Sequence, residues 1–387
     1  MNKRNFFNII DFGSSKVRFT TFDINLNEKF SDSIKVNLNA DLQNHFEVVN
    51  KIIRKAEKKF SYHIEDIILL LDSAELFVID ISLTKNVESR LKIVKLYESL
   101  ILELNQIVSS NHNKYYLSQI IMDKCIVDNK KIYEEFPEGN MVANNLKVDF
   151  KLICFPKKLI NNIKAQFSKI NIKVTNFFCT SYIKSQSYLK NLNFKNASFL
   201  DIGFEKTSLI YFLNKKLKFI QVIPIGGNHI TKDISNVFNL SLDEAEKIKR
   251  LFNKSENEFS YQQNVNNNIS IKDIISKNIS IDTLKKVILY RVQEIIDLSY
   301  NKYDSNSYKI CLKNSDLFLI GNGSLLFKDN SFQLKDSFEF KNISFFNETD
   351  YQICNSGLTY YLNNYQFEKK NYKKQGIFER FFNYFAK

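Results

Sequence analysis

The sequence predicts an α/β protein built from two similar half-domains that face each other. Asp11–Phe22 reads DFGSSKVRFTTF and Asp201–Phe212 reads DIGFEKTSLIYF, 190 residues later, with Asp, Gly, Lys and Phe in register. Each segment follows an apolar run and has the pattern of a strand, a tight turn and a second strand. A third apolar run, Leu317–Ile320, ends in Gly-Asn-Gly-Ser. Because a repeat this far apart indicates a duplicated unit, we expect two related halves.

The amino-acid composition limits the kinds of protein that this chain can be. The 387 residues, 44% of them hydrophobic, predict two to three domain-sized units. The formal charge of +13 is spread along the chain without an arginine-rich segment, zinc-finger spacing or RNP motif, so nucleic acid is not an expected partner. Five widely spaced cysteines without a C-x-x-C pair indicate reduced cytosolic thiols. No apolar run approaches the roughly 18 residues of a transmembrane helix.

The spacing of apolar residues, together with capping and turn residues, predicts the remaining helices and strands. Ser241-x-x-Glu244 is a capping box that predicts the start of one helix. Residues 83–160 read as a separate α+β insertion, and 253–270 as an Asn-rich loop. The predicted helices are 42–60, 87–109, 159–169, 181–192, 229–238, 242–252, 281–301 and 356–363. The predicted strands, besides the hairpins, are 67–81 (one or two strands), 115–128, 147–155, 219–225 and 317–320.

The first hairpin carries groups that suit a phosphate. Gly13 permits a tight turn, and the amides of Gly13, Ser14 and Ser15 can form an anion nest. Asp11 can hold a hydrated Mg²⁺, and Lys16 can offset phosphate charge. An ordinary hairpin with a polar tip is the alternative for one such motif.

A second copy of the motif, with Asp201 and Gly203, favours two hairpins that grip phosphates from opposite sides. The strand at 317–320, followed by a glycine turn that opens a helix, suits a place against a nucleoside. Position 326 is Leu, so the G-x-G-x-x-G dinucleotide fingerprint is not met, and no G-x-x-x-x-G-K-[ST] P-loop occurs.

These elements, in this order, resemble the actin, Hsp70 and sugar-kinase superfamily, and within it most closely the bacterial cell-division FtsA family. The resemblance implies actin-like (ribonuclease H-like) duplicated domains that flank a nucleotide cleft, with an α+β insertion subdomain and a C-terminal amphipathic helix. The segments that carry it are IIDFGSSKVR at 9–18, FLDIG at 199–203, VIPIGGNHITKDI at 222–234, LDEAEKIKR at 242–250 and LIGNGSLL at 319–326.

The same resemblance divides the chain. It implies subdomain 1A at 1–82, 161–192 and 355–365, the inserted subdomain 1C at 83–160, subdomain 2A at 193–228 and 311–354, subdomain 2B at 229–310, a linker at 366–376 and a membrane-targeting helix at 377–387.

ATP and Mg²⁺ are the implied cofactors. Asp11 and Asp201 would lie on the Mg²⁺ side and act through water. Glu246 and Lys249 would flank the adenosine, although a solvated i,i+3 pair is the alternative from spacing alone. The other implied nucleotide contacts are Gly13, Ser14, Ser15, Lys16, Gly203, Lys206, Thr207, Gly321, Asn322, Gly323 and Ser324.

The second hairpin departs from the family pattern. Phe204, Glu205 and Lys206 stand where FtsA-like proteins have further glycines and then Thr. Bulk and a negative charge there hinder the approach of backbone to a triphosphate, so we expect at most a slow ATPase. No residue is assigned to position the attacking water; Glu205 is a weak candidate, and Thr180 and Ser181 are weaker ones.

The C-terminal segment has the pattern of an interfacial helix. At about 100° per residue, its large apolar side chains share one arc, with polar residues opposite and basic residues before it. These apolar residues are Ile377, Phe378, Phe381, Phe382 and Phe385. A terminal helix docked on the protein's own core is the alternative, and the FtsA resemblance favours a membrane anchor.

The resemblance therefore implies a cell-division protein that polymerises with ATP on the cytoplasmic side of the inner membrane, bound to anionic lipids. It would tether filaments of FtsZ, a tubulin homologue, at the division septum through the helices at 229–252. Residues 83–160 would contact other protomers and division proteins. Two alternatives share the fold: a PilM-type pilus-assembly adaptor, and a small-molecule kinase, for which no catalytic Asp signature is found.

Overall fold

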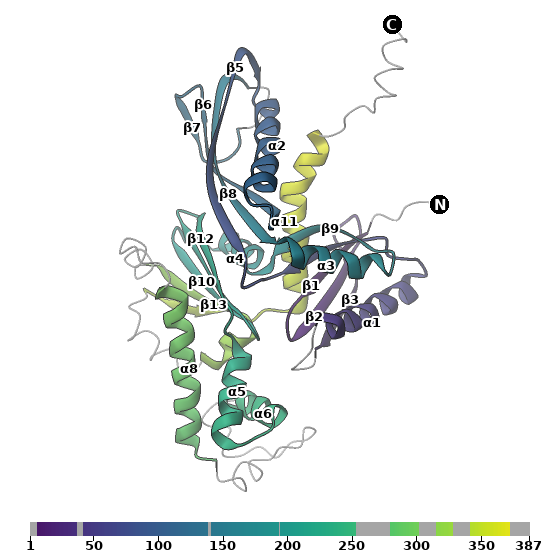
Figure 1. The fold of residues 1–387 in the computed structure, drawn as a ribbon, viewed down its shortest axis with the longest axis vertical. Helices are drawn as coiled ribbons and strands as arrows, with labels where there is room; N and C mark the ends of the chain where they lie inside the picture. The colour runs from purple at the N-terminus through teal and green to yellow at the C-terminus, as the bar shows by residue number, and fades with distance from the viewer. Residues whose placement is uncertain are drawn as a thin grey trace.

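The structure, a computed structural model, has three β-sheets arranged along an elongated molecule (Figure 1). It describes residues 6–36, 42–137, 141–192, 194–252, 279–301, 315–327 and 341–371. Two five-stranded sheets lie at the middle of the molecule. A four-stranded sheet forms one end, and helices that lie in the chain between strands of the second sheet form the other (Figure 1).

The first sheet contains the first predicted hairpin at its centre. Strand β1 (Phe7–Phe12) pairs antiparallel with β2 (Lys16–Phe22) and parallel with β4 (Asp66–Leu71). The edge strands are β3 (Glu28–Lys35) and β9 (Lys173–Cys179). Helices that pack against this sheet or its edge are α1 (Leu42–Phe60), α3 (Lys157–Ser168), α4 (Thr180–Asn191) and α11 (Asp350–Asn371).

The second sheet repeats this arrangement, which confirms the predicted duplication. Strand β10 (Ala197–Ile202) pairs antiparallel with β11 (Thr207–Leu213) and parallel with β13 (Asp316–Ile320). The edge strands are β12 (Lys216–Ile223) and β14 (Ile343–Phe345), and the 3-10 helix η1 (Asn322–Phe327) follows β13. Next to it lie α5 (Gly227–Phe238), α6 (Leu242–Phe252) and α8 (Ile281–Asn301).

Both central sheets share one hydrophobic core. Tyr182 on α4 is buried, and it lies in the same cluster as Ile9 of the first sheet and Phe199 and Phe318 of the second. A further cluster joins the second sheet to α5, α6 and α8. Continuous apolar burial across the two halves fixes how their hairpins face each other.

The third sheet has its own core under one helix. It is ordered β5 (Phe77–Lys92), β8 (Val142–Pro156), β6 (Tyr115–Val127) and β7 (Lys131–Tyr133), and α2 (Ile93–Asn111) packs on it. The predicted insertion is therefore an α+β unit. Its first strand continues to Lys92, so the helix expected to start at residue 87 starts at Ile93.

The C-terminal helix differs from its predicted bounds. It begins at Asp350 and packs against β1, β2 and β4 of the first sheet, whereas residues 311–354 were predicted to belong with the second. Residues 366–371, expected as a linker, continue α11. The apolar arc predicted at 377–385 lies outside the described residues. Among the described helices, none is long and apolar enough to cross a membrane.

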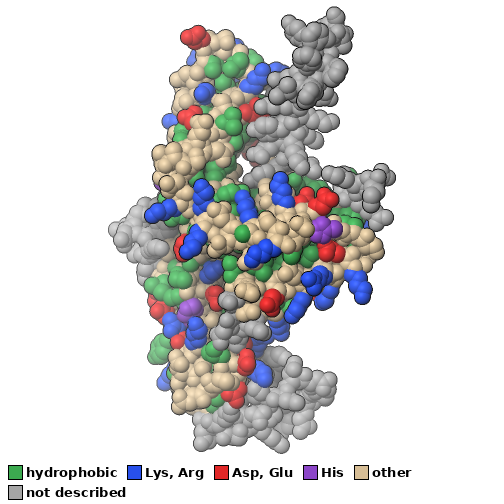
Figure 2. Space-filling view, turned by 45° about the vertical axis from the view of Figure 1, so that its right-hand side comes forward, with side chains coloured by type: hydrophobic (Ala, Val, Ile, Leu, Met, Phe, Trp, Pro, Cys, Tyr) green, Lys and Arg blue, Asp and Glu red, His purple; other side chains and the backbone are tan. Residues whose placement is uncertain are grey.

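Charge is dispersed on the surface. Figure 2 shows lysine and arginine side chains spread across one face, with acidic and hydrophobic side chains among them. The positive net charge of the sequence therefore does not form a single basic patch on the part of this face that the structure describes.

Candidate nucleotide-binding site

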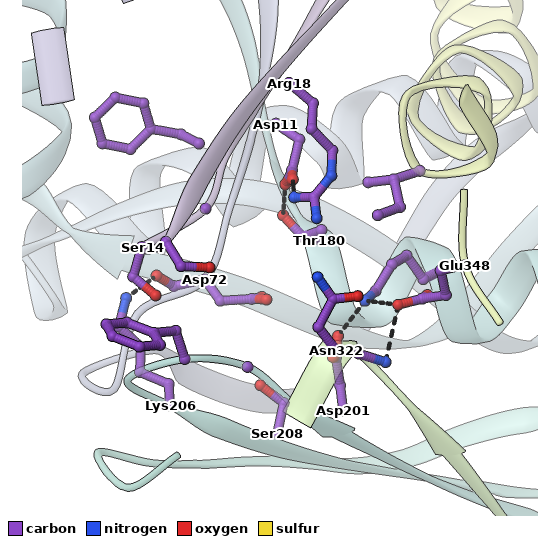
Figure 3. A pocket seen from close by; sticks show the side chains of 18 residues that line it. Asp11, Ser14, Arg18, Asp72, Thr180, Asp201, Lys206, Ser208, Asn322 and Glu348 are labelled. Atoms are coloured by element: carbon purple, nitrogen blue, oxygen red, sulfur yellow. Dashed lines mark hydrogen bonds and ion pairs between the residues drawn. The ribbon is translucent and has the colours of Figure 1, made fainter. Parts of the chain in front are cut away.

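A polar cavity lies where the two hairpins face each other (Figure 3). Its lining comes from the turns of both hairpins, from the ends of β4 and β13, and from α4 and the segment before α11. The lining residues are Asp11, Phe12, Gly13, Ser14, Ser15, Arg18, Asp72, Thr180, Lys184, Asp201, Gly203, Phe204, Lys206, Ser208, Gly321, Asn322, Glu348 and Ile353.

The first wall of the cavity holds an ion pair between Asp11 and Arg18. The two residues are cross-strand partners in the β1–β2 register, and Arg18 Nη1 lies 2.7 Å from Asp11 Oδ2. Thr180 Oγ1 donates a hydrogen bond of 3.3 Å to Asp11 Oδ1. Burial raises the pKa of Asp11, although the nearby charges of Arg18 and Lys184 oppose this.

The opposite wall holds a second ion cluster, centred on Lys184 of α4. Its ammonium lies 2.7 Å from Asp201 Oδ2 and 3.0 Å from Glu348 Oε2. Glu348 is itself fixed, because Oε2 accepts the Gly321 N–H at 2.8 Å and Oε1 accepts the Tyr188 hydroxyl at 3.0 Å. All three charged side chains are less than a tenth exposed.

Burial and ion pairing shift the pKa values of Lys184 and Asp201 in opposite directions. Burial disfavours the charged ammonium of Lys184, yet the Asp201 and Glu348 carboxylates outweigh burial and raise the pKa of Lys184. Burial raises the pKa of Asp201, and repulsion from Glu348 adds to the increase, whereas Lys184 opposes it. The site therefore holds two carboxylates around one ammonium.

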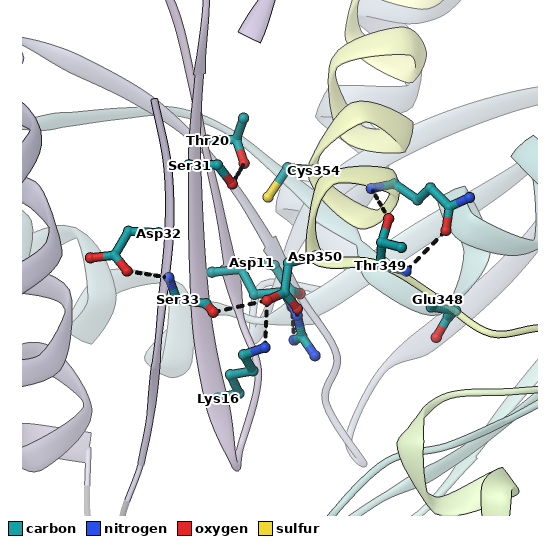
Figure 4. A network of polar contacts seen from close by, with 12 residues as sticks. Asp11, Lys16, Thr20, Ser31, Asp32, Ser33, Glu348, Thr349, Asp350 and Cys354 are labelled. Carbon is teal, nitrogen blue, oxygen red and sulfur yellow. Dashed lines mark hydrogen bonds and ion pairs between the residues drawn. The ribbon is translucent and has the colours of Figure 1, made fainter. Parts of the chain in front are cut away.

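A third polar network, which includes Lys16, joins β2 and β3 to Asp350 at the start of α11 (Figure 4). Lys16 Nζ contacts Asp350 Oδ2, Arg18 Nε donates to Asp350 Oδ1 at 2.6 Å, and Ser33 Oγ donates to Oδ2 at 2.8 Å. Burial acts to raise the pKa of Asp350, but these hydrogen bonds outweigh it and lower the pKa to about 2. Lys16, predicted to contact phosphate, is directed at Asp350 and does not line the cavity.

The cavity brings together many of the residues named from the sequence. Those that line it are Asp11, Gly13, Ser14, Ser15, Asp201, Gly203, Lys206, Gly321 and Asn322. Lys206 also spans the two halves, because its ammonium donates to the Asp72 backbone oxygen at 2.8 Å.

Other predicted residues serve the local fold and do not line the cavity. Thr207 donates to the Ile225 oxygen at 2.7 Å, and Ser324 donates to the Gly321 oxygen at 2.7 Å. A Cβ on Gly323 would lie 2.6 Å from a methyl group of Ile202. Glu205 is exposed and lies outside the lining.

Glu246 and Lys249, predicted to flank the adenosine, are bonded to each other and to helix α5. Lys249 Nζ donates to the Gly227 oxygen at 2.8 Å and to Thr231 Oγ1 at 2.7 Å, and Glu246 accepts from Thr231 and Arg250. Both are buried, so the pair is not the solvated one that spacing allows, and neither lines the cavity.

The turn of the second hairpin is held against the start of α5. The N–H groups of Gly227 and Asn228 donate to the backbone oxygens of Gly203 and Phe204, at 3.0 and 2.6 Å. A Cβ on Gly226 would lie 2.7 Å from the Gly203 oxygen, which explains the glycine at that position. The first amides of α5 are thus satisfied by the turn itself.

Five polar or charged lining residues were not anticipated from the sequence: Arg18, Asp72, Lys184, Ser208 and Glu348. Three of them have a sequence signal in retrospect. Asp72 directly follows β4, as Gly321 follows β13, and the ends of parallel strands meet at one sheet edge. Arg18 and Ser208 occupy matching positions opposite Asp11 and Asp201 in the two hairpins.

Sequence comparison agrees with the resemblance found in the motifs. The profile of the family described as "Cell division protein FtsA" matches residues 198–346. Cell division protein FtsA of Bacillus subtilis is 26% identical over 223 residues, which cover 57% of this chain and 50% of that protein. FtsA of Buchnera aphidicola subsp. Baizongia pistaciae is 24% identical over 298 residues, 74% of this chain and 67% of that protein.

The chain is similar in sequence to cell division protein FtsA. It matches about half the length of the first curated FtsA relatives, 50% and 45%.

Solved structures support the actin-like fold of this chain. A PilM–PilN type IV pilus biogenesis complex has a TM-score of 0.55 at 14% identity and covers 90% of this chain and 89% of that one. MreB 5 of Spiroplasma citri bound to AMPPNP has a TM-score of 0.52 at 12% identity and covers 96% and 99%. At these identities the likeness shows the fold alone.

The side chains that line this cavity do not suit a metal held by free carboxylates. Asp11 and Asp201 face the cavity, but each has a protein cation within 2.7 Å. Among the described residues no group of three or more His, Cys, Asp or Glu side chains is placed to hold a metal ion. A divalent ion beside Asp11 or Asp201 would meet the charge of Arg18 or Lys184.

Proposed function

We propose that this chain is an ATP-binding, actin-like cell-division protein that polymerises on the cytoplasmic face of the inner membrane and anchors filaments of the tubulin homologue FtsZ at the division septum. The observation that carries the nucleotide part is the cavity between the hairpins. Its lining includes Gly13, Ser14 and Ser15 of the first hairpin turn and Gly203 of the second. The relatives named cell division protein FtsA support the cellular role.

Phosphates would lie between the two hairpin turns, and three features support this. Backbone amides at the Gly13–Ser15 turn suit an anion. Lys206 and Arg18 supply positive charge at the lining. Asn322, exposed at the start of η1, would contact the nucleoside side. The predicted Mg²⁺ is not part of this proposal, because Asp11 and Asp201 are already paired.

Hydrolysis would be slow or absent. Phe204 lines the cavity, and the turn oxygens of Gly203 and Phe204 accept hydrogen bonds from α5. Glu205, the weak candidate for positioning water, is exposed and does not line the cavity, and Thr180 is bonded to Asp11. Phosphate release by the purified protein should stay near the rate without protein, and brisk turnover would contradict this part.

Membrane attachment would depend on the segment 377–387. Phe381→Glu and Phe385→Glu place a charge on the predicted apolar arc, whereas Asn383→Glu places the same charge on the polar side and is the matched control. Vesicles with anionic lipids should pellet the wild type and Asn383→Glu but neither phenylalanine variant. Deletion of 376–387 should also abolish pelleting, and retained pelleting would refute the anchor.

Partner binding is tested with the same vesicles. The helices α5 and α6 would form the surface that meets FtsZ, and the third sheet with α2 would contact other protomers and division proteins. Adding FtsZ filaments should recruit them to vesicles only when the full chain is present. Recruitment of a pilus-assembly peptide in place of FtsZ would favour the PilM-type alternative, for which the likeness of fold is the support.

A further inference from the structure

We propose that Lys184 is a resident cation that takes the place of a divalent metal in this cavity, so that the nucleotide binds about equally well with and without Mg²⁺. This inference rests on the proposed function, because it concerns how the same cavity binds a nucleotide. It specifies the ligand as the metal-free nucleoside triphosphate.

The ammonium of Lys184 is held at a fixed point. Its side chain is 5% exposed, and it lies 2.7 Å from Asp201 and 3.0 Å from Glu348. Hydrogen bonds from Tyr188 and from the Gly321 amide hold Glu348 in turn. A buried ammonium braced in this way keeps its position without a ligand.

The same ammonium has a donor left for a ligand. An ammonium carries three N–H groups, and Asp201 and Glu348 accept two of them among the described residues. Lys184 lines the cavity beside Asp201, where a metal would otherwise screen the phosphates from the carboxylate. It can therefore donate to a phosphate oxygen while it neutralises Asp201.

In both hairpins a cation of the chain neutralises the aspartate, but the cation comes from a different element in each. In the first, Arg18 is the cross-strand partner of Asp11 and pairs with it. In the second, the matching position is Ser208, and the cation comes from α4 as Lys184. Each aspartate that was expected to face Mg²⁺ thus has one cation supplied by the chain itself.

A divalent metal has little to gain at this position. Four acidic side chains line the cavity, Asp11, Asp72, Asp201 and Glu348, against three basic ones, Arg18, Lys184 and Lys206. The lining is therefore close to neutral before any metal enters. A metal next to Asp201 would have to displace Lys184 from that carboxylate and leave the buried ammonium with Glu348 as its remaining acidic neighbour among the described residues, which is costly.

The test is calorimetric titration of the full chain with ATP, once in excess MgCl₂ and once in excess EDTA. We expect the two dissociation constants of the wild type to differ by less than about fivefold, a small coupling between sites. Wild-type binding that is detected only with MgCl₂ would overturn the inference and leave the proposed nucleotide site standing. Absence of binding in both solutions would overturn the proposed function and the inference together.

Variants assign the effect to Lys184. In Lys184→Met, affinity in EDTA should fall by about tenfold or more relative to MgCl₂, because Asp201 then faces the phosphates unscreened. Lys190→Met, on the exposed side of the same helix, is the control and should behave as the wild type. If Lys184→Met binds equally well in both solutions, Lys184 is not the screening cation.

A second variant guards against loss of folding. Lys184→Met with Glu348→Gln removes one charge of each sign from the cluster, so it leaves Asp201 as the single unpaired carboxylate. Thermal melting establishes that it is folded. It should show the same dependence on MgCl₂ as the single variant, and metal-independent binding by this folded protein would overturn the inference.

Discussion

Asp11 on β1 and Arg18 on β2 face each other across the first hairpin, with Nη1 of Arg18 2.7 Å from Oδ2 of Asp11. Asp11 is 4% exposed, and the Arg18 side chain is also mostly buried. The pair therefore joins β1 to β2 by a side-chain contact at the wall of the cavity. Loss of one partner leaves a buried charge without compensation.

Arg18→Gln should destabilise the protein substantially. The expected loss in free energy of unfolding is about 3–5 kcal/mol, because the buried Asp11 carboxyl loses the cation that compensates its burial. Lys55→Met, which breaks the exposed Lys55–Asp32 pair, is the control, with an expected loss of at most about 1 kcal/mol. Urea titration followed by circular dichroism gives both values, and similar losses for the two variants would contradict the importance of the buried pair.

Gly321→Ala should distort the second wall of the cavity. Gly321 has φ of +81°, and a Cβ there would meet Asp201 Oδ1 and lie 2.6 Å from the Ile202 backbone oxygen. Backbone strain of this kind costs about 1–3 kcal/mol. Asn322→Ala, one residue later and exposed, should leave stability nearly unchanged. Thermal unfolding of both variants checks the prediction, which fails if Gly321→Ala melts at the wild-type temperature.

Lys206→Met should loosen the connection between the two halves. The Lys206 ammonium donates to the Asp72 oxygen across the cavity, and a hydrogen bond from a charged group contributes about 1.5–3 kcal/mol. Amide hydrogen exchange at residues 72–76 should then speed up by about tenfold or more. Lys215→Met, on an exposed turn of the second sheet, is the control. Unchanged exchange in Lys206→Met would show that the contact does not hold the halves.

The Asp350 network predicts a dependence of stability on pH. The pKa of Asp350 is about 2 in the folded chain, against 3.8 for an ordinary aspartate. Its carboxylate therefore stabilises the fold fully above pH 4, and this contribution is lost as pH falls towards 2. Asp350→Asn should melt below the wild type at pH 7, and the difference should shrink below pH 4. A difference that stays constant down to pH 3 would contradict the assignment.

The two hairpins were predictable from sequence because they are local. Asp11 with Gly13, and Asp201 with Gly203, mark the tight turns, and apolar runs mark the strands. The register then follows, since the position and length of the turn fix the pairing of the two strands in a hairpin. Predicted residues at these turns line the cavity for the same reason.

Lys184 and Glu348 could not be predicted, because they reach the cavity from elements far from the hairpins in the chain. Neither carries a local signal: Lys184 lies in an ordinary helical stretch, and Glu348 in a segment before α11. Lys16 failed in the opposite way. The motif favours a phosphate contact, but Asp350, 334 residues later, attracts its ammonium. Long-range charge pairing thus decides which of these side chains line the cavity.

A crystal structure of the full chain with a non-hydrolysable ATP analogue tests the central claim most directly. We expect the phosphates to lie between the turn at Gly13–Ser15 and the turn at Gly203–Lys206, with the Lys184 ammonium within hydrogen-bond distance of a phosphate oxygen. A nucleotide whose phosphates lie outside this cavity, or a chain that remains free of nucleotide at saturating concentration, would contradict it.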